Sequence, residues 1–249
     1  MLKQLLTLFG ISTAAQVNAQ PIPDAAEQAL LRQIAERSKA DPLIGAKIGS
    51  KELTQRLLGA MKTERGVHIE SLLCALGALA GYSCQAAVRA QAVARGLPEV
   101  GLLTSVETKD GKIYFFGDDL NKLLAESQYS VWNIAGGGAQ QAGCGTLPDV
   151  ADIFKHASAV VGTQAFGVPR VPDQHTPHDL PLNYIHTLWP ALKPLIVKFC
   201  PNPEHWPVLL SLSIQEVIVM GRATLDPCLA LRLVMESAVP MSKVNLNDA

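Results

Sequence analysis

The chain has 249 residues, of which 48% are hydrophobic and 17% are charged, and its formal net charge is −1. This length is enough for one large domain or two small ones. Soluble domains typically have about 25% charged residues, so the low charged fraction indicates helices buried on most of their circumference, or a surface covered by a partner. The chain has no run of like charge, which disfavours nucleic acid as a partner, because that binding depends on clustered Lys and Arg.

The cysteine content favours a reducing compartment, and we therefore expect a cytoplasmic protein. An odd number of cysteines in a chain of this length is unlike the even set of a secreted disulfide framework. Most of them lie in or beside apolar stretches, where a free thiol behaves as a small buried hydrophobe. The five are widely spaced and form no CxxC pair: Cys74, Cys84, Cys144, Cys200 and Cys228.

The N-terminus supports the alternative of an exported protein. Lys3 precedes an apolar run, and residues 17–19 fit the small-x-small rule for a signal peptide that ends near Ala19. The single positive charge and the polar residues inside the run favour a short amphipathic lead helix instead. We divide the chain into a lead segment, residues 1–23, and one helical domain, residues 24–249.

The sequence of the first part of the domain predicts two helices. Apolar residues recur at helical spacing over residues 24–40, and this helix ends before Pro42, because the residue before a proline avoids helical angles. Ser50 is the expected N-cap of a second helix, which closes at Gly66.

A third helix is expected over residues 67–95. Residues 71–88 carry no charge, and this run reaches the lower edge of the roughly 17–25 residues that cross a membrane. Its glycine, serine and glutamine residues, and the lack of a flanking basic cluster, predict a central core helix and no transmembrane span. Gly77 and Gly81 are four positions apart, so they share a face on which another helix can approach closely.

One β-hairpin is predicted near the middle of the chain, over about residues 103–116. Residues 109–112 contain Asp-Gly, the preferred sequence of a two-residue type I′ turn. This turn places Val106 opposite Phe115, and the apolar face should pack on the helices, since a lone hairpin is only marginally stable. The expected fold class is mainly α: a helical globular domain with one central β-hairpin.

Two segments in the second half depart from a regular helical pattern. Residues 133–145 are uncharged and glycine-rich, so their backbone is either mobile or held close to another group. Residues 168–181 are proline-rich and contain His175 and His178, and we expect an ordered surface loop. Thr146 is the expected cap of the helix between these segments.

Two tryptophan–proline pairs form a short internal echo. Trp189-Pro190 and Trp206-Pro207 are 17 positions apart, and two copies at this period are too few for a solenoid. We interpret them as the starts of two successive helices, each with an early proline and a tryptophan at its mouth. Asp226-Pro227 then starts the last helix.

Asp149, Asp152 and His156 form the first candidate site. Their spacing of i, i+3 and i+7 places them along one face of the expected helix. Two carboxylates and an imidazole suit a divalent ion such as Mn²⁺, Fe²⁺ or Zn²⁺, and His175 or His178 would complete the shell. The simpler alternative is a pair of aspartates attracted to a helix N-terminus, with a histidine on a solvated face.

Cys144 is a second candidate, as a catalytic nucleophile. It lies between glycines just before a helix N-terminus, a position that lowers the pKa of a thiol, and His156 is one possible base. The alternative is a small residue in a crowded turn. His68 and Glu70 form an acid–base pair only if the chain is extended there, because residues i and i+2 lie on different faces of a helix.

The sequence has no GxSxG, HExxH, EF-hand or kinase motif. The leading interpretation is a non-catalytic intracellular protein without a cofactor. Its surface, formed by residues 133–145 and 168–181, would bind a protein partner or a second copy of the chain. The alternative is a metal-dependent, hydrolase-like enzyme with a divalent metal on Asp149, Asp152 and His156.

Overall fold

The computed structural model describes residues 25–246. The lead segment and its alternative signal peptide therefore lie outside the described residues. In chain order the elements are α2 (Ala25–Arg37), α3 (Ile44–Met61), β1 (Lys62–Thr63), β2 (Gly66–Val67), α4 (Ile69–Ala94), β3 (Thr104–Glu107), β4 (Ile113–Phe116), α5 (Asp118–Asn121), η1 (Lys122–Glu126), α6 (Val131–Gln141), α7 (Val150–Ala159), η2 (Asp173–His175), α8 (Pro181–Phe199), η3 (Pro203–His205), α9 (Trp206–Gly221) and α10 (Pro227–Met241).

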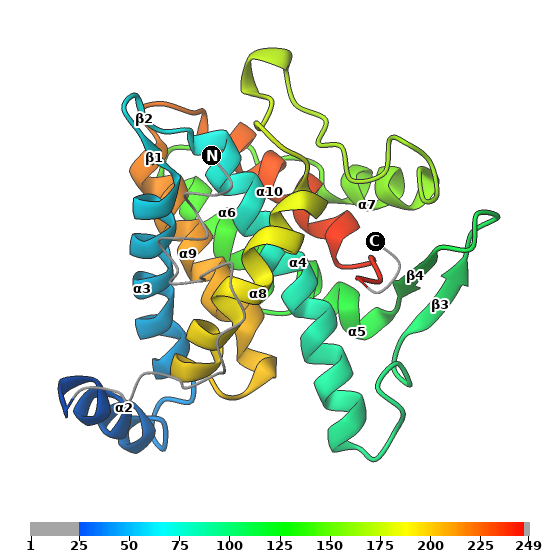
Figure 1. Cartoon of the computed structure of the whole chain (residues 1–249). Helices are drawn as coiled ribbons and strands as arrows, with labels where there is room; N and C mark the ends of the chain where they lie inside the picture. The colour runs from blue at the N-terminus through cyan, green and yellow to red at the C-terminus, as the bar shows by residue number, and fades with distance from the viewer. Residues whose placement is uncertain (1–24, 247–249) are drawn as a thin grey trace, which may run out of the picture.

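Helix α4 lies at the centre of the molecule (Figure 1) and packs against α8, α9 and α10. Helix α3 packs against α8 and α9, and α6 packs against α9 and α10. One cluster of buried apolar side chains extends from Ile34 in α2 to Val244 near the C-terminus. The chain is thus mainly α-helical with a β-hairpin, and this prediction is confirmed.

The uncharged run of α4 lies in the core. Leu72, Leu76 and Leu79 are fully buried, because other helices surround α4 on several sides. Within residues 25–246, α4 is the one helix long and apolar enough to cross a membrane, and 89% of its most apolar window is buried in the protein. Burial by the chain's own helices accounts for its hydrophobicity.

The hairpin has a register one residue away from the predicted one. Val106 lies opposite Tyr114, and Ser105 lies opposite Phe115. The loop is longer by one residue than a type I′ turn: the Gly111 N–H donates to the Thr108 carbonyl at 2.9 Å, and Gly111 has a φ of 81°. A glycine at positive φ after a tight turn is the usual form of a three-residue hairpin loop.

The hairpin docks through one strand and its edge. All of β3 is exposed, whereas Tyr114 and Phe115 of β4 are buried. The Phe115 N–H donates to the Lys243 carbonyl at 2.8 Å, and Tyr114 forms a bridge with Val244. The C-terminal segment therefore covers the free edge of β4, which the predicted packing of one apolar hairpin face did not include.

Two predicted N-caps were wrong. Helix α3 begins at Ile44, so Ser50 lies within it and its hydroxyl donates to the Lys47 carbonyl at 3.0 Å. Asp149, rather than Thr146, caps α7, and its Oδ1 accepts the N–H groups of the second and third helical residues. A carboxylate at this position also interacts favourably with the helix dipole.

The glycine-rich segment and the first tryptophan–proline pair are both helical. Gly136, Gly137 and Gly138 lie inside α6, and a Cβ atom on Gly138 would meet Gln215 of α9 at 2.8 Å. Of the two alternatives, the backbone is thus held close to a neighbour. Helix α8 starts at Pro181 and continues through Pro190, so only the second pair, at Trp206, marks a helix start.

Candidate functional site

The structure does not assemble the predicted metal site. Asp149 caps α7, and an Asp152 oxygen pairs with the Arg170 guanidinium at 2.9 Å. His175 and His178 lie in the loop before α8, where they contact Glu70 and Ser71 at the start of α4. In the part of the chain that the structure describes, no group of three or more His, Cys, Asp or Glu side chains is placed to hold a metal ion.

Arg170 binds Asp152 at the surface, where the Asp152 side chain is 51% exposed. Its guanidinium also pairs at 2.7 Å with Glu236, a carboxylate of α10 whose side chain is 3% exposed. Burial lowers the pKa of Arg170, but its hydrogen bond to Glu236 and the attraction of both carboxylates outweigh burial and raise it. Through the Arg170 side chain, this network links Asp152 of α7 to Glu236 of α10.

Cys144 is bonded to Cys228, with their Cα atoms 5.1 Å apart, and is therefore not a free nucleophile. The bond joins the turn after α6 to the first turn of α10. The other three cysteines are free and buried, as predicted for small apolar residues. Burial raises the pKa of the Cys74 thiol to about 12, which leaves it unreactive.

A cluster of histidines surrounds Glu70 at the N-terminus of α4. His68 is the N-cap, with an extended backbone (φ −74°, ψ 104°), and its Nε2 lies 3.3 Å from Glu70 Oε2. The chain is thus extended where the His68–Glu70 pair requires it. His68 Nδ1 lies 2.8 Å from Ser71 Oγ and accepts the Ser71 N–H.

The loop of residues 172–180 closes this cluster from the other side. His175 Nδ1 lies 2.9 Å from Glu70 Oε1, and the His178 N–H donates to Ser71 Oγ at 2.9 Å. The rings of His68 and His178 stack with their centroids 3.9 Å apart. Spatial contacts across about a hundred residues of sequence therefore create the cluster.

The order Ser71, His68, Glu70 is that of a nucleophile, a base and a carboxylate. Ser71, however, is 2% exposed, and its hydroxyl is engaged by the His178 N–H and by the Tyr184 side chain. A substrate atom has no approach to this oxygen. The cluster holds the loop and does not present a nucleophile.

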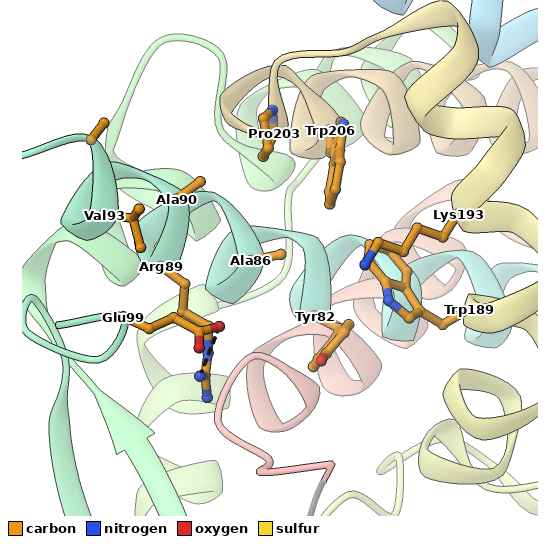
Figure 2. Close-up of a pocket in the computed structure, with 11 residues that line it drawn as sticks. Tyr82, Ala86, Arg89, Ala90, Val93, Glu99, Trp189, Lys193, Pro203 and Trp206 are labelled. Carbon is orange, nitrogen blue, oxygen red and sulfur yellow. Dashed lines mark ion pairs between the residues drawn. The ribbon is translucent and has the colours of Figure 1, made fainter.

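A cleft of about 470 Å³ lies between α4, α8 and the η3 turn. Figure 2 shows Tyr82, Ala86 and Ala90 along one face of α4, with Trp189 of α8 and Trp206 of α9 opposite. Tyr82, Ala86 and Ala90 are four residues apart, which places them on one face of the helix. Apolar side chains thus form the floor and two walls of the cleft.

Three aromatic rings meet edge to face in this cleft. Tyr82 and Trp189 have ring centroids 5.0 Å apart at 86°, and Trp189 and Trp206 have centroids 5.7 Å apart at 62°. The Trp206 indole N–H donates to the Cys200 carbonyl at 2.8 Å, which fixes this ring. Edge-to-face contact stabilises such rings beyond simple burial, so the walls are preformed.

The polar groups of the cleft are mostly hydrogen-bond donors. Glu99, the carboxylate that lines it, pairs with Arg89 at 3.3 Å. Lys193 extends along Trp189 in Figure 2, and no carboxylate within residues 25–246 pairs with it. The Trp189 indole N–H and the Tyr82 hydroxyl also have no hydrogen-bond partner among the residues described. The cleft therefore combines apolar walls with unused donors.

The sequence indicated this cleft only in part. The tryptophan–proline echo singled out Trp189 and Trp206, but nothing marked Tyr82, because it sits in a uniformly apolar helix. The predicted interaction surface is divided between different neighbours. Residues 133–145 largely form α6, which packs on α9, whereas the loop of residues 172–180, here called the histidine loop, packs on the start of α4.

Comparisons with known proteins add no assignment to this geometry. No protein-family model, curated protein or solved structure matches the chain. The proposal for function rests on the cleft itself.

Proposed function

We propose that this chain is a binding protein that holds a small apolar molecule with an anionic group in the cleft between α4 and α8. The main support for this proposal is the preformed set of three aromatic rings around a cleft of about 470 Å³. Ligand pockets typically measure about 300–1,000 Å³ and combine aromatic walls with a few polar groups. This cleft has both properties.

The donors define the class of ligand. Lys193 supplies a cation, and the Trp189 N–H supplies a second donor on the same wall, whereas Glu99 is neutralised by Arg89. An aryl or alkyl carboxylate satisfies these groups, with its apolar part against the rings and its oxygens toward Lys193. A cationic ligand finds no free carboxylate here.

Isothermal titration with 2-naphthoate and with the uncharged 2-naphthylmethanol tests this proposal. We expect saturable binding of one naphthoate per chain, weakened at least about tenfold by Trp189→Ala, since buried aromatic anchors dominate binding energy. Lys193→Met should weaken naphthoate about tenfold and leave naphthylmethanol unchanged, because it removes one charge-assisted contact. Lys198→Met, on the same helix but paired with Glu27, is the matched control.

Absence of binding by both compounds contradicts the proposed function. Binding of both with equal affinity, unaffected by Lys193→Met, retains a binding protein but contradicts the anionic class. Native mass spectrometry of the same preparation measures self-association, which the low charged fraction favours.

We also propose that the chain folds in an oxidising compartment. The support is the Cys144–Cys228 bond, since structural disulfides are rare in the cytosol. This observation favours the exported alternative over a cytoplasmic location. Intact mass of the protein recovered from cells tests it: an oxidised chain that begins at Gln20 is expected, and a reduced chain that retains Met1 would contradict it.

A further inference from the structure

Three imidazoles share the single carboxylate of Glu70, and one of them, His178, does not contact it. Glu70 contacts His68 through one oxygen and His175 through the other, and its side chain is 9% exposed. His178 has no carboxylate contact within residues 25–246, and its ring lies on that of His68. When both stacked rings carry protons, like charges face each other at a centroid distance of 3.9 Å.

Contacts of these same residues attach the 172–180 loop to the start of α4. His175 binds Glu70, the His178 N–H binds Ser71 Oγ, and the stacked ring covers His68. The Cys74 thiol adds a weak contact to the Asp179 carbonyl at 4.0 Å. The acid-sensitive contact is the His68–His178 stack, in which two charged rings would repel each other, whereas a charged His175 still binds the Glu70 carboxylate.

We propose that His68, Glu70, His175 and His178 form an acid-operated latch, which fastens residues 172–180 to the start of α4 at neutral pH and releases them on acidification. Helix α8 begins at Pro181, directly after the loop. The latch therefore determines whether the first turn of α8 is tied to α4.

The titration of His68 has the sign that the latch requires. Burial lowers its pKa from 6.5, the attraction of Glu70 opposes this, and repulsion by His178 adds to it. The released form, with His68 in water, takes up a proton more readily than the fastened form. The contribution of His68 to the stability of the fastened form is therefore complete above pH 6.5. It decreases as pH falls below that value.

Glu70 keeps its charge through this range. Burial raises its pKa, but the hydrogen bond from His175 and the nearby imidazoles outweigh burial and lower it below 4.5. The other groups at the latch are the Asp179 carboxylate, which accepts the Leu180 N–H and an Asn183 amide hydrogen, and the Tyr184 hydroxyl and Cys74 thiol, whose pKa values burial raises. Because their pKa values are raised, Tyr184 and Cys74 stay uncharged between about pH 7 and pH 5.5.

Hydrogen–deuterium exchange of the full chain, without ligand, tests the latch at about pH 7.5 and about pH 5.5, on either side of the ordinary histidine pKa. After correction for the intrinsic pH dependence of exchange, peptides that cover residues 172–180 should lose at least about tenfold protection at the lower pH. Peptides from α9 and α10 should keep theirs.

His178→Phe separates the latch from general acid destabilisation. Phenylalanine keeps the stacked ring and the backbone N–H but takes no proton, so the repulsion of a charged His68 by His178 is removed and this variant should lose less loop protection at the lower pH than the wild type. His186→Phe is the matched control, because His186 is an exposed histidine of α8 outside the cluster. Equal protection of the wild-type loop at both pH values, or an unchanged response in His178→Phe, would overturn the proposal.

Helix α8 also carries Trp189 and Lys193, so release of its first turn loosens one wall of the cleft. This consequence rests on the proposed function. It predicts at least about fivefold weaker naphthoate binding by the wild type at the lower pH, with a smaller change in His178→Phe. A loop that opens without a change in affinity would confirm the latch and contradict its coupling to the cleft.

Discussion

At the scale of single residues, Lys243 is a charge held in apolar surroundings. The residue is 2% exposed, and its Nζ lies 4.5 Å from the centre of the Phe116 ring and 5.9 Å from that of Phe154. Within residues 25–246 no carboxylate pairs with it. Burial lowers the pKa of Lys243 from 10.5 to about 8. The two rings attract the ammonium group, but they replace only part of its hydration.

Lys243→Met should therefore stabilise the protein at neutral pH. The unfolded chain binds more protons than the folded chain between pH 8 and pH 10.5, so the cost of burying the ammonium is complete below pH 8 and disappears as pH rises toward 10.5. We expect the free energy of unfolding to increase by about 2–3 kcal/mol at about pH 7, and the gain to shrink by about pH 10. Urea unfolding of both proteins at the two pH values measures this difference. A less stable variant at neutral pH would show that the aromatic contacts outweigh desolvation.

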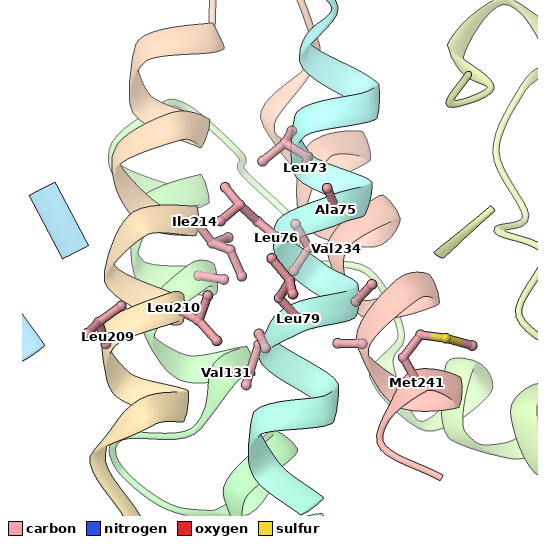
Figure 3. Close-up of a cluster of buried hydrophobic side chains, with 14 of the residues drawn as sticks. Leu73, Ala75, Leu76, Leu79, Val131, Leu209, Leu210, Ile214, Val234 and Met241 are labelled. Atoms are coloured by element: carbon pink, nitrogen blue, oxygen red, sulfur yellow. The ribbon is translucent and has the colours of Figure 1, made fainter. Parts of the chain in front are cut away.

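At the scale of elements, the contact between α4 and α10 depends on two glycines. Figure 3 shows Leu76 and Leu79 of α4 directed toward the neighbouring helices, with Val234 of α10 beside them. A Cβ atom on Gly77 would lie 2.6 Å from the Val234 carbonyl oxygen, and one on Gly81 would overlap the Ala238 carbonyl. The two backbones therefore touch along this face.

Gly81→Ala should separate these helices. The added methyl group has no space, and overpacking of a core contact costs about 3 kcal/mol of unfolding free energy. Gly59→Ala is the matched control, because Gly59 lies in α3 with no atom near its Cβ position. That change should stabilise the protein by about 0.5–1 kcal/mol, as alanine is the better helix former. Denaturant unfolding of both variants distinguishes the two cases, and equal effects would contradict the close contact.

The sequence predicted the elements best where a single pattern determined them. The uncharged run of residues 71–88 predicted the core helix, and Gly77 and Gly81 predicted its close contact, because both signals are local. The predicted hairpin register was wrong because Asp110-Gly111 fits either a two-residue or a three-residue loop. The hydrogen bond from Thr108 to Asp110 favours the three-residue loop. Helix α8 continues through Pro190, since its buried face outweighs the proline.

The sites were less predictable because they depend on contacts between distant segments. Cys144 and Cys228 are 84 positions apart, and nothing in their spacing pairs them. The sequence indicates Glu70 and His175 as separate candidates, because their contact at 2.9 Å spans a separation of 105 residues. Asp152 has the spacing of a metal ligand and instead pairs with Arg170.

At the scale of the whole molecule, the disulfide ties together segments that the core already holds side by side. Helix α6 packs against α10, and the Cys144–Cys228 bond joins the turn after α6 to the start of α10. A crosslink between segments that are adjacent in the folded state stabilises mainly by restricting the unfolded chain.

The Cys144→Ser/Cys228→Ser double variant should fold and be less stable. A loop of 84 residues predicts a loss of about 4.5 kcal/mol in the free energy of unfolding, in the chain-entropy model. Chemical unfolding in the absence and presence of a thiol reductant measures this loss. The wild type should match the variant only when reduced, and a wild type insensitive to the reductant would contradict a stabilising bond.

The same bond makes part of the second half of the chain a closed covalent ring, which contains α7, the histidine loop, α8 and α9. A protease that cuts the ring once, at the exposed part of the 172–180 loop, cannot divide the molecule, because the two pieces remain joined through sulfur. The loop can thus open, or be nicked, while α8 and α9 stay attached to the rest of the fold. A molecule cut once in this loop keeps every described helix on one covalent framework.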